Sequence, residues 1–450
     1  MNIRKLIRFS MKQFWKYKRY SVGIALNVLI SLAVSSLFAL SFKYIIDEVT
    51  IGKNDSKLFI LFFAMILGCI IYLASQIGGS YWLSKIAERM KDDLRLDMFE
   101  HLQKLPISYH NNVSKGSLTS RFTTDLASMQ SSFLSLVPSV YAILSIGLTL
   151  GLTAWLHWGL AVISFLGIVL ASVLPAYINR KAIGYNDNLK SEQTILNDYI
   201  LEHLTIHKTI RAFNLIEWEL NRLKRATLSI FPLAVKSHFT SQTSPISVSM
   251  ALFFFNIVSV MVGAYLVTKD IMSVGMLVAY QSLYLTMSQQ LKELSRHLPL
   301  LAATTASYSR IEQLLNEKPE KTVSSKDIKT VQLDKIVNDI TLQDVSFAYT
   351  ENYPILHEVN LTIEQNKYVA VVGRNGSGKS TIMNLLMRFY EPTRGKVEFD
   401  GMDARSISLD SLRNTISYVS QDTDLMNLSI FDNIKLGKLD AKKSRCMKRQ

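Results

Sequence analysis

The residues with the clearest chemical potential form a run that fits G-x-x-x-x-G-K-[ST]. Glycines at this spacing let backbone N–H groups point at phosphate oxygens, because no Cβ stands in the way. The ammonium of Lys379 supplies a charge for the β- and γ-phosphates, and the hydroxyl of Ser380 can be a ligand of Mg²⁺. A helix expected over Lys379–Tyr390 turns its positive N-terminal end toward the same place. The pattern therefore predicts a phosphate-binding site made by Gly373, Arg374, Asn375, Gly376, Ser377, Gly378, Lys379, Ser380 and Thr381.

The composition changes after Leu315, which separates this segment from a more apolar N-terminal part. Residues 316–339 are charged and have little apolar pattern, so they are predicted to be a linker. Alternating apolar residues then predict strands at Ile340–Tyr349, Val359–Ile363 and Tyr368–Val372, the last of which leads into Gly373. A further apolar strand is expected at Ile416–Ser420. An apolar strand before the motif and a helix after it are the context in which a phosphate loop works.

The N-terminal part has the composition of a membrane protein. Hydrophobic residues make up 48% of the 450 residues and charged residues only 19%, against about 25% in typical soluble domains. A helix needs about 20 mostly apolar residues to cross a bilayer. Stretches of this length predict spans at Ser21–Ile46, Leu58–Leu83, Phe133–Trp155, His157–Ile178, Pro245–Val267 and Ile271–Leu294. The last also contains Gln, Ser and Thr, and this polar face either lines a pathway or packs by hydrogen bonds against other helices.

Basic residues predict the orientation of these spans. The chain has 50 Lys+Arg against 36 Asp+Glu, a net charge of +14. Lysine and arginine are concentrated before the first span and in the loops after the second and fourth, and the other loops between spans are poor in them. The positive-inside rule therefore places both termini in the cytoplasm. No motif or aromatic–basic face supports the other explanation of a basic chain, a nucleic-acid partner, so none is expected.

The two basic loops are long and have helical patterns. Apolar residues at steps of three or four from Ser84 to Lys104 predict that the second span continues as a helix until Pro106 ends it. A similar pattern covers Ile195–Arg225. The short elements expected at the two tips, Gly116–Arg121 and Phe213–Leu220, are either solvated connections or contact surfaces for the nucleotide site.

These features together resemble an ATP-binding-cassette (ABC) exporter half-transporter, from about residue 15 to about residue 437. Specific matches are the phosphate loop, the run VSFAYTENYPILHEVNLTI before it and the run YVSQDTDLMNLSIFDNIKLG after it. The resemblance implies a multidomain membrane protein, in which an all-α six-helix transmembrane domain precedes a partial α/β P-loop nucleotide-binding domain. The expected divisions are a transmembrane domain at 1–315, a linker at 316–339, a partial ATP-binding domain at 340–437 and a basic tail at 438–450.

The resemblance also implies roles for single residues. Tyr349 would stack on adenine, although an exposed strand tyrosine can equally pack on its neighbours. Gln421 would reach Mg²⁺ and the attacking water, sharing the metal with Ser380; its plainer interpretation is an ordinary polar loop residue. ATP and Mg²⁺ are the cofactors implied. Gly116–Arg121 and Phe213–Glu219 would lie at the coupling helices that dock on the nucleotide-binding domains.

Several parts of the family pattern are not found among these 450 residues. They are a serine–glycine signature loop, a strand ending in Asp-Glu and a later histidine that contacts γ-phosphate. Phosphoryl transfer needs several such groups at once. The expectation is therefore a truncated chain that cannot hydrolyse ATP alone, and whose nucleotide-binding part is of marginal stability by itself.

The function expected from the resemblance is that of a subunit of an ATP-driven exporter, working by alternating access. The alternatives are a non-catalytic or regulatory membrane subunit and a non-functional remnant. The implied partners are the lipid bilayer, in a bacterial cell membrane, and a second half-transporter subunit in a homo- or heterodimer. The spans hold few charges, which slightly favours an apolar or amphipathic cargo. Trp155, Tyr280, Tyr284 and Phe253–Phe255 could line its cavity, or could face lipid and pack.

Overall fold

A computed structural model of the chain describes residues 3–50, 55–320, 331–350, 353–421 and 425–439. The chain forms two compact units. The first contains residues 1–100 and 116–316, and the second contains residues 101–115 and 317–450. The nucleotide-binding unit thus includes a short piece of chain that follows the second predicted span.

The first unit consists of helices. Transmembrane segments favour helices because every backbone N–H and C=O is then paired within the segment. In chain order the elements are α1 (Ile3–Lys16), α2 (Lys18–Tyr44), a π-helix η1 (Ile45–Thr50), α3 (Asp55–Gln103, whose last residues enter the second unit), α5 (Lys115–Ser120), a π-helix η2 (Arg121–Asp125), α6 (Leu126–Leu156), α7 (Trp158–Thr205), α8 (His207–Ala212), α9 (Ile216–Thr268) and α10 (Val274–Asn316).

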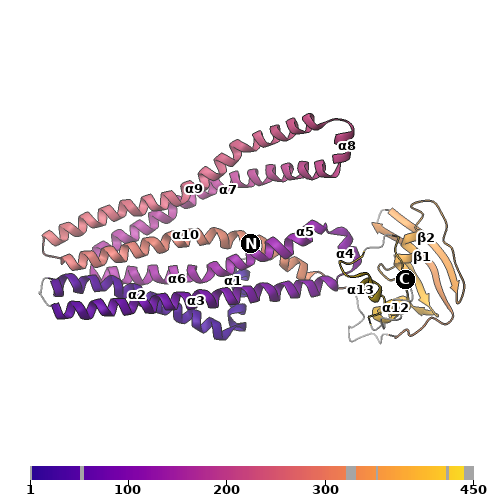
Figure 1. Ribbon diagram of the computed structural model, residues 1–450, viewed down its shortest axis with the longest axis horizontal. Helices are drawn as coiled ribbons and strands as arrows, with labels where there is room; N and C mark the ends of the chain where they lie inside the picture. The colour runs from indigo at the N-terminus through magenta and orange to yellow at the C-terminus, as the bar shows by residue number, and fades with distance from the viewer. Residues whose placement is uncertain (1–2, 51–54, 321–330, 351–352, 422–424, 440–450) are drawn as a thin grey trace. The chain divides into compact units, whose positions relative to one another are not determined.

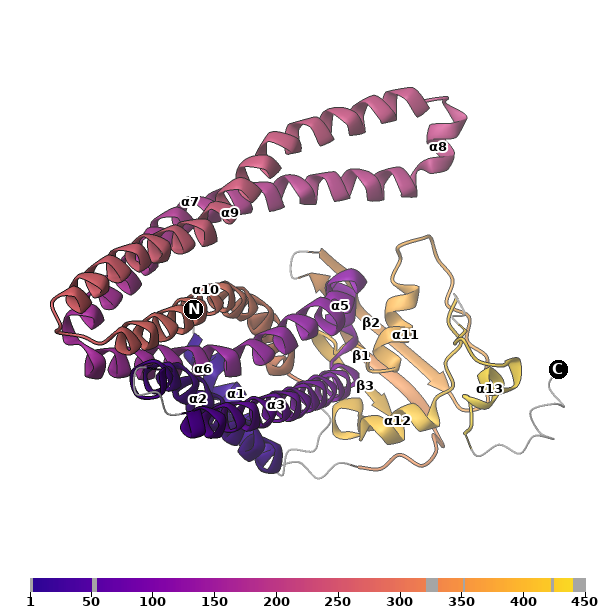
Figure 2. The same cartoon turned by 60° about the vertical axis from the view of Figure 1, so that its left-hand side comes forward.

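Within this unit the helices pack in pairs. Helix α7 runs along α9, and α6 runs along α10, which also contacts α2. Figures 1 and 2 both show α7 and α9 leaving the other helices of the unit together and meeting at α8. This arm carries the second of the two predicted long loops.

The contact between α6 and α10 depends on small polar residues. One face of α6 buries a series of serines and threonines at helical spacing, namely Ser132, Ser135, Ser139, Ser145, Thr149 and Thr153. The hydroxyls of Ser139 and Thr149 donate to carbonyls one turn earlier, at 2.7 Å each, so these buried groups are paired within their own helix. Small side chains let two helices approach closely inside a membrane. At the end of this contact, Arg310 Nε of α10 donates to Asp125 Oδ2 of η2 at 2.9 Å.

The predicted spans all lie mainly in helices. Among the described residues, four helical stretches are long and apolar enough to cross a membrane: Lys18–Asp47, Lys57–Gln103, Lys115–Leu156 and Ile216–Thr268. They contain the first, second, third and fifth predicted spans. The fourth lies in α7, where Trp158–Val173 is a shorter apolar stretch. The sixth overlaps α10, whose mixed polarity the sequence already indicated.

The second unit is built on an antiparallel sheet. The strands are β1 (Asp339–Thr350), β2 (Tyr353–Glu364), β3 (Arg394–Phe399) and β4 (Met402–Asp403), in the order β2-β1-β3-β4. Val345 pairs with Val359 of β2, and Leu342 pairs with Val397 of β3. The remaining elements are α4 (Ile107–Asn112), α11 (Lys379–Leu386), a 3₁₀ turn η3 (Ala404–Ser406), α12 (Leu409–Thr415) and α13 (Ile430–Lys435).

The core of this unit lies between the sheet and two helices. Phe347, Val397 and Phe399 of the sheet are buried together with Leu385 of α11 and Leu412 of α12. Part of the predicted linker joins them, because Leu333 is buried in the same cluster and Val331 forms a bridge with Ile407. Apolar residues at 331, 333 and 336 are enough to hold this end of the linker on the domain.

Three predictions for the second unit need correction. Tyr368–Val372 and Ile416–Ser420, predicted as strands, form no strand in the structure. A strand needs a hydrogen-bonded neighbouring strand, and neither segment belongs to the sheet that the described residues form. The side chains of Val372 and Val419 are 87% and 90% exposed. The helix predicted over Lys379–Tyr390 ends at Leu386, shortly before Arg388 takes a left-handed φ of 49°.

Candidate nucleotide-binding site

The phosphate loop turns by means of two glycines with positive φ. Gly376 has a φ of 83° and Gly378 a φ of 88°, conformations that favour glycine over any residue with a Cβ. The N–H of Ser377 donates to the carbonyl of Arg374 at 3.2 Å, which closes the turn between them. The side chains of Arg374, Asn375 and Ser377 are exposed. The loop is therefore an open backbone turn.

Gly378 also meets a packing requirement. A Cβ at this position would lie 2.6 Å from Leu356 Cδ2 of β2, so the strand leaves no space for a side chain. The same residue is the N-cap of α11, and Ile382 N–H donates to its carbonyl at 3.0 Å. Strand β2 thus supports the loop at the point where the helix begins.

Lys379 is the first residue of α11, and its side chain turns back over the loop. Its Nζ donates to the carbonyls of Gly373 and Arg374 at 2.9 and 2.8 Å. The ammonium is therefore held on the concave side of the loop, as expected of a charge that meets phosphate oxygens. Thr381 is buried at the start of the same helix, whereas Ser380 is exposed.

Tyr349 lies at the end of β1 and is tied to α11. Its hydroxyl accepts from Asn384 Nδ2 at 3.0 Å and donates to Thr381 Oγ1 at 3.4 Å. Its ring stands edge-on to those of Phe347 and Tyr390, at 4.9 Å between centroids in both pairs. The side chain is still 46% exposed. The geometry thus combines local packing with an accessible part of the ring.

The structure brings together only some of the predicted site residues. The nine residues of the phosphate loop and Tyr349 meet at the start of α11. Gln421 is exposed and follows Ile416–Ser420, which is not a strand, and the next three residues lie outside the described part of the chain. The placement of Gln421 against the loop therefore stays a prediction.

The residues present fit a nucleotide phosphate. Nothing lies within 4 Å of a Cβ placed at Gly376, so a phosphate can approach the backbone there. The donors are backbone N–H groups, the Lys379 ammonium and the Ser380 hydroxyl. Within the described residues no cluster of His, Cys, Asp or Glu could hold a metal ion. Mg²⁺ keeps several waters and commonly binds through substrate phosphates, so Ser380 and Gln421 would hold it only together with the nucleotide.

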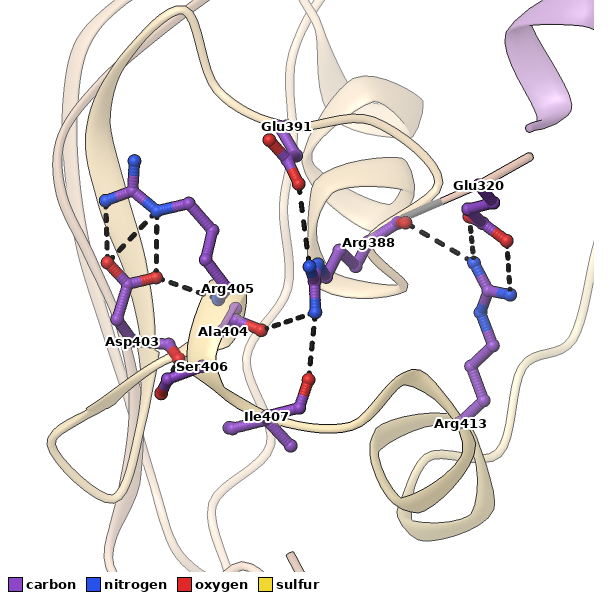
Figure 3. Close-up of polar contacts among 9 residues, drawn as sticks. All are labelled: Glu320, Arg388, Glu391, Asp403, Ala404, Arg405, Ser406, Ile407 and Arg413. Atoms are coloured by element: carbon purple, nitrogen blue, oxygen red, sulfur yellow. Dashed lines mark hydrogen bonds and ion pairs between the residues drawn. The ribbon is translucent and has the colours of Figure 1, made fainter. Parts of the chain in front are cut away.

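Charged residues that the sequence analysis did not identify fasten the far end of α11. Figure 3 shows Arg388 Nη1 donating to the carbonyls of Ala404 and Ile407, at 2.9 Å each. The side chain of Arg388 is buried, and Glu391 lies 3.5 Å from its Nη2. These bonds hold the segment after α11 against η3. Signals for them are weak in a single sequence, because a surface arginine and a buried one look alike.

A second arginine links this region to the beginning of the predicted linker, within the same unit. Arg413 of α12 pairs with both carboxylate oxygens of Glu320, at 3.0 and 2.7 Å (Figure 3). Its Nη2 also donates to the carbonyl of Arg388 at 3.4 Å. A bidentate arginine–carboxylate pair fixes geometry as well as charge. Glu320 therefore connects the beginning of the predicted linker to the helix beside α11.

Two carboxylates stabilise the turns that hold the sheet. Burial acts to raise the pKa of Asp400, but hydrogen bonds from the N–H groups of Val337, Asn338 and Asp339 outweigh it and hold this pKa below its usual value. The guanidinium of Arg405 lowers the pKa of Asp403 in the same direction (Figure 3). Both groups are therefore ionised at neutral pH.

Residues 101–115 bring the end of a predicted span into the nucleotide-binding unit. Asn111 Nδ2 of α4 donates to the hydroxyl of Tyr390 at 2.9 Å. The N–H of Glu320 donates to the carbonyl of Lys104 at 2.7 Å. Helix α4 of this loop lies in the second unit, whereas Gly116–Arg121 lies in the first, so docking by Gly116–Arg121 stays a prediction. Pro106 ends α3 and lets the chain turn into α4, as predicted.

The fold and the site together define a class of protein: a helical membrane domain followed on the same chain by a phosphate-loop domain. Residues 22–291 match the model of the ABC transporter transmembrane region, and residues 356–449 match that of the ABC transporter. The chain belongs to the ABC transporter family.

Relatives and a solved structure agree with this assignment. The chain is 28% identical to an uncharacterized ABC transporter ATP-binding protein of Bacillus subtilis, over 96% of this chain and 72% of the relative. It is 27% identical to an ATP-dependent lipid A-core flippase of Hahella chejuensis, over 95% and 72%. A bacterial Atm1-family ABC exporter with ATP bound has the same fold, with a TM-score of 0.77, 21% identity and coverage of 95% and 75%. The chain is therefore an ABC exporter half-transporter with a membrane domain and an ATP-binding domain.

Proposed function

We propose that this chain binds ATP through its phosphate loop and uses the binding energy to drive alternating access in the helical domain. The observation that carries the proposal is the position of Lys379, whose ammonium is held at 2.8–2.9 Å from two loop carbonyls at the start of α11. Tyr349 would receive the adenine on its exposed part. Gln421 and Ser380 would share Mg²⁺ with the phosphates.

The route from the nucleotide to the membrane would run through α3 and α4. Helix α3 is continuous from Asp55, just before the second predicted span, to Gln103 in the nucleotide-binding unit. Helix α4 then contacts Tyr390, whose ring packs against Tyr349. A shift of Tyr349 on nucleotide binding would therefore move Tyr390 and α4, and so displace the end of α3.

A second half-transporter subunit would complete the assembly, as a homo- or heterodimer. The arm formed by α7, α8 and α9 leaves large apolar side chains uncovered at its tip, among them Phe213 at 72% exposure and Trp218 at 54%. Exposed apolar groups of this size favour a protein partner over water. The predicted docking element Phe213–Glu219 lies at this tip.

We further propose that the 450-residue polypeptide binds ATP but does not hydrolyse it unaided. The loop lysine and a candidate γ-phosphate sensor are present, but the sequence contains no Asp-Glu pair after the phosphate loop and no serine–glycine signature loop. Without a catalytic carboxylate the attacking water lacks a group to orient it. The same set of residues would serve a non-catalytic or regulatory subunit.

The cargo would be an amphipathic or lipid-like molecule. A groove of about 640 Å³ lies beside α9 and α10, with Phe253, Tyr284 and Lys292 among its lining residues. This size suits a small organic ligand. Phe253 and Tyr284 are two of the predicted cavity residues, whereas Tyr280 is fully buried and hydrogen-bonded to Ser164. A relative that is a lipid A-core flippase supports the same class. The protein would act in a bacterial cell membrane with both termini in the cytoplasm.

The test uses the full chain in nanodiscs and two readouts, photo-cross-linking of azido-ATP and release of phosphate. We expect Lys379→Ala to reduce cross-linking at least tenfold, because the loop loses its only lysine. Lys367→Ala, which removes an exposed lysine in a nearby turn, is the matched control and should have no effect. Phosphate release should stay at background in all three proteins.

Each of the two proposals, nucleotide binding at the loop and the lack of unaided hydrolysis, has its own contradicting result. Phosphate release that Lys379→Ala abolishes would overturn the claim that this chain is catalytically incomplete. Cross-linking that is equal in the wild type and in Lys379→Ala would overturn nucleotide binding at the loop itself.

A further inference from the structure

A second groove lies among the membrane helices, away from the one beside α9 and α10. It has a volume of about 530 Å³ and is formed by one face of α2, the facing side of α3 and the end of α6. Its walls are Val34, Leu37, Phe38, Leu40, Ser41, Lys43 and Tyr44 of α2, Leu61, Ala64, Met65 and Gly68 of α3, and Trp155 of α6. The groove has free space beside Gly68, because a Cβ there would meet only Val34 Cγ1, at 3.9 Å.

Most of the groove is lined by apolar side chains, and one end carries a charge. Among the residues that the structure describes, Lys43 is its only charged lining residue, and its Nζ lies over the ring of Trp155 at 5.6 Å from the centroid. The hydroxyl of Tyr44 belongs to the same end, and the remaining walls are mostly hydrocarbon. Lys43 is at the opposite end of α2 from Lys18 and Arg19, so it marks one membrane–water boundary of the span. Lysine and tryptophan are typical of that depth.

Lys43 has no carboxylate partner among the described residues. The acid one turn further along, Asp47, would be the usual partner of a lysine four residues away. Its carboxylate instead accepts from the Ser273 hydroxyl and, at 2.9 Å, from the N–H of Gly275, where it caps the start of α10. Within the described part of the chain, no carboxylate neutralises the charge of Lys43, and an anion from outside the protein would do so.

The position of the groove along the membrane helices favours a lipid headgroup over a free inorganic ion as that anion. The most apolar stretch of α3 has no buried residues, so the described part of the chain leaves it uncovered. A helical stretch of this length and hydropathy is expected at the depth of the hydrocarbon region. A free inorganic anion would gain nothing from the apolar walls, whereas a lipid offers an acyl chain to the walls and a charged headgroup to the lysine.

We propose that the groove between α2 and α3 binds one phospholipid with an anionic headgroup. The headgroup phosphate lies against the Lys43 ammonium beside Trp155, and an acyl chain lies along Leu37, Met65 and Gly68. This site is separate from the proposed transport pathway. The lipid stabilises the pair of α2 and α3 at the end where Asp47 holds α10.

The experiment is native mass spectrometry of the full chain, purified in a mild detergent with equal amounts of phosphatidylglycerol and phosphatidylcholine. The wild type is expected to retain one phosphatidylglycerol in preference to phosphatidylcholine. Lys43→Gln should reduce this preference about fivefold, the effect of one lysine near an anionic lipid. Lys43→Arg, which keeps the charge, should restore it. Gly68→Leu should reduce binding of both lipids by filling the groove.

A matched control is Lys269→Gln. Lys269 also lies over an aromatic ring, that of Tyr265 at 5.8 Å, but does not line the groove. An equal loss in Lys269→Gln and Lys43→Gln would overturn the proposal. So would a dimer fraction that falls in Lys43→Gln while lipid retention is unchanged, which would assign the groove to a second subunit. Displacement of the lipid by millimolar inorganic phosphate would assign it to a free anion and would overturn the proposal as well.

Discussion

The hydroxyl of Tyr390 accepts a hydrogen bond from Asn111 Nδ2 at 2.9 Å, and the ring of Tyr390 stands edge-on to Tyr349. One side chain therefore contacts both the short helix that follows a predicted span and the proposed adenine-stacking residue. This relationship supplies a specific atomic contact for the proposed coupling between the nucleotide and the membrane domain.

We expect Asn111→Ala to loosen α4 from the nucleotide-binding unit. The variant loses one hydrogen bond at a partly exposed site, which is worth about 1 kcal/mol. Trypsin should then cut faster at Lys104 and Lys115, which flank the helix. Tyr390→Phe removes the same bond and keeps the ring, so it should give a similar rate. Cleavage rates equal to the wild type in both variants would contradict the role of this contact.

Substitutions of Tyr349 distinguish stacking on adenine from simple packing of the ring on Phe347 and Tyr390. Tyr349→Phe keeps the ring and loses only the hydrogen bonds to α11, so the affinity for ATP should change by less than about threefold. Tyr349→Ala should weaken ATP binding about three- to tenfold, the usual worth of one aromatic stacking contact. Fluorescent ATP titration measures both. Equal affinities in the wild type and Tyr349→Ala would show that the ring only packs on Phe347 and Tyr390.

The ion pair between Glu320 and Arg413 should contribute to the stability of the nucleotide-binding unit. Arg413→Ala leaves the Glu320 carboxylate and two backbone carbonyls without their donor, at a cost of about 1–3 kcal/mol. Arg413→Lys should recover only part of this, because an ammonium cannot replace the bidentate guanidinium. Pulse proteolysis in urea gives the free energies. A double-mutant cycle with Glu320→Gln that shows no coupling would contradict the pairing.

The stability of the same unit should depend on Asp400 at acid pH. Its pKa is held below the usual 3.8 in the folded state, so the stabilisation is complete above that pH and is lost as the pH falls through the lower folded pKa. Asp400→Asn should cost about 1 kcal/mol or less at neutral pH, because the group is close to solvent. Its stability should also fall less steeply below pH 4. Pulsed hydrogen exchange of residues 331–345 measures both; parallel pH profiles would contradict the assignment.

Sequence patterns predicted the phosphate loop, the extent of α3 and strands β1 and β2, because these conformations depend on residues that are close together in the chain. The phosphate loop could be recognised because Gly376 and Gly378 must take positive φ, and only glycine does so readily. The extension of α3 and its end before Pro106 followed from helical spacing and proline sterics. Strands β1 and β2 followed from alternating apolar residues.

Other parts could not be predicted, because they depend on which segments meet in space. Tyr368–Val372 has the sequence of a strand but no neighbour to pair with among the described residues. Arg388 and Arg413 look like surface residues in the sequence, and only the positions of Ala404, Ile407 and Glu320 give them partners. The place of α4 in the second unit depends on Asn111 reaching Tyr390.

The central claim is that ATP held by the phosphate loop acts on the end of a membrane helix. Hydrogen–deuterium exchange of the full chain in nanodiscs, with and without MgATP, tests it most directly. We expect slower exchange at residues 373–386 and a changed rate at residues 101–115, with both effects lost in Lys379→Ala. Protection at 373–386 with no change at 101–115 would contradict the coupling, and no protection at either would contradict ATP binding at this site.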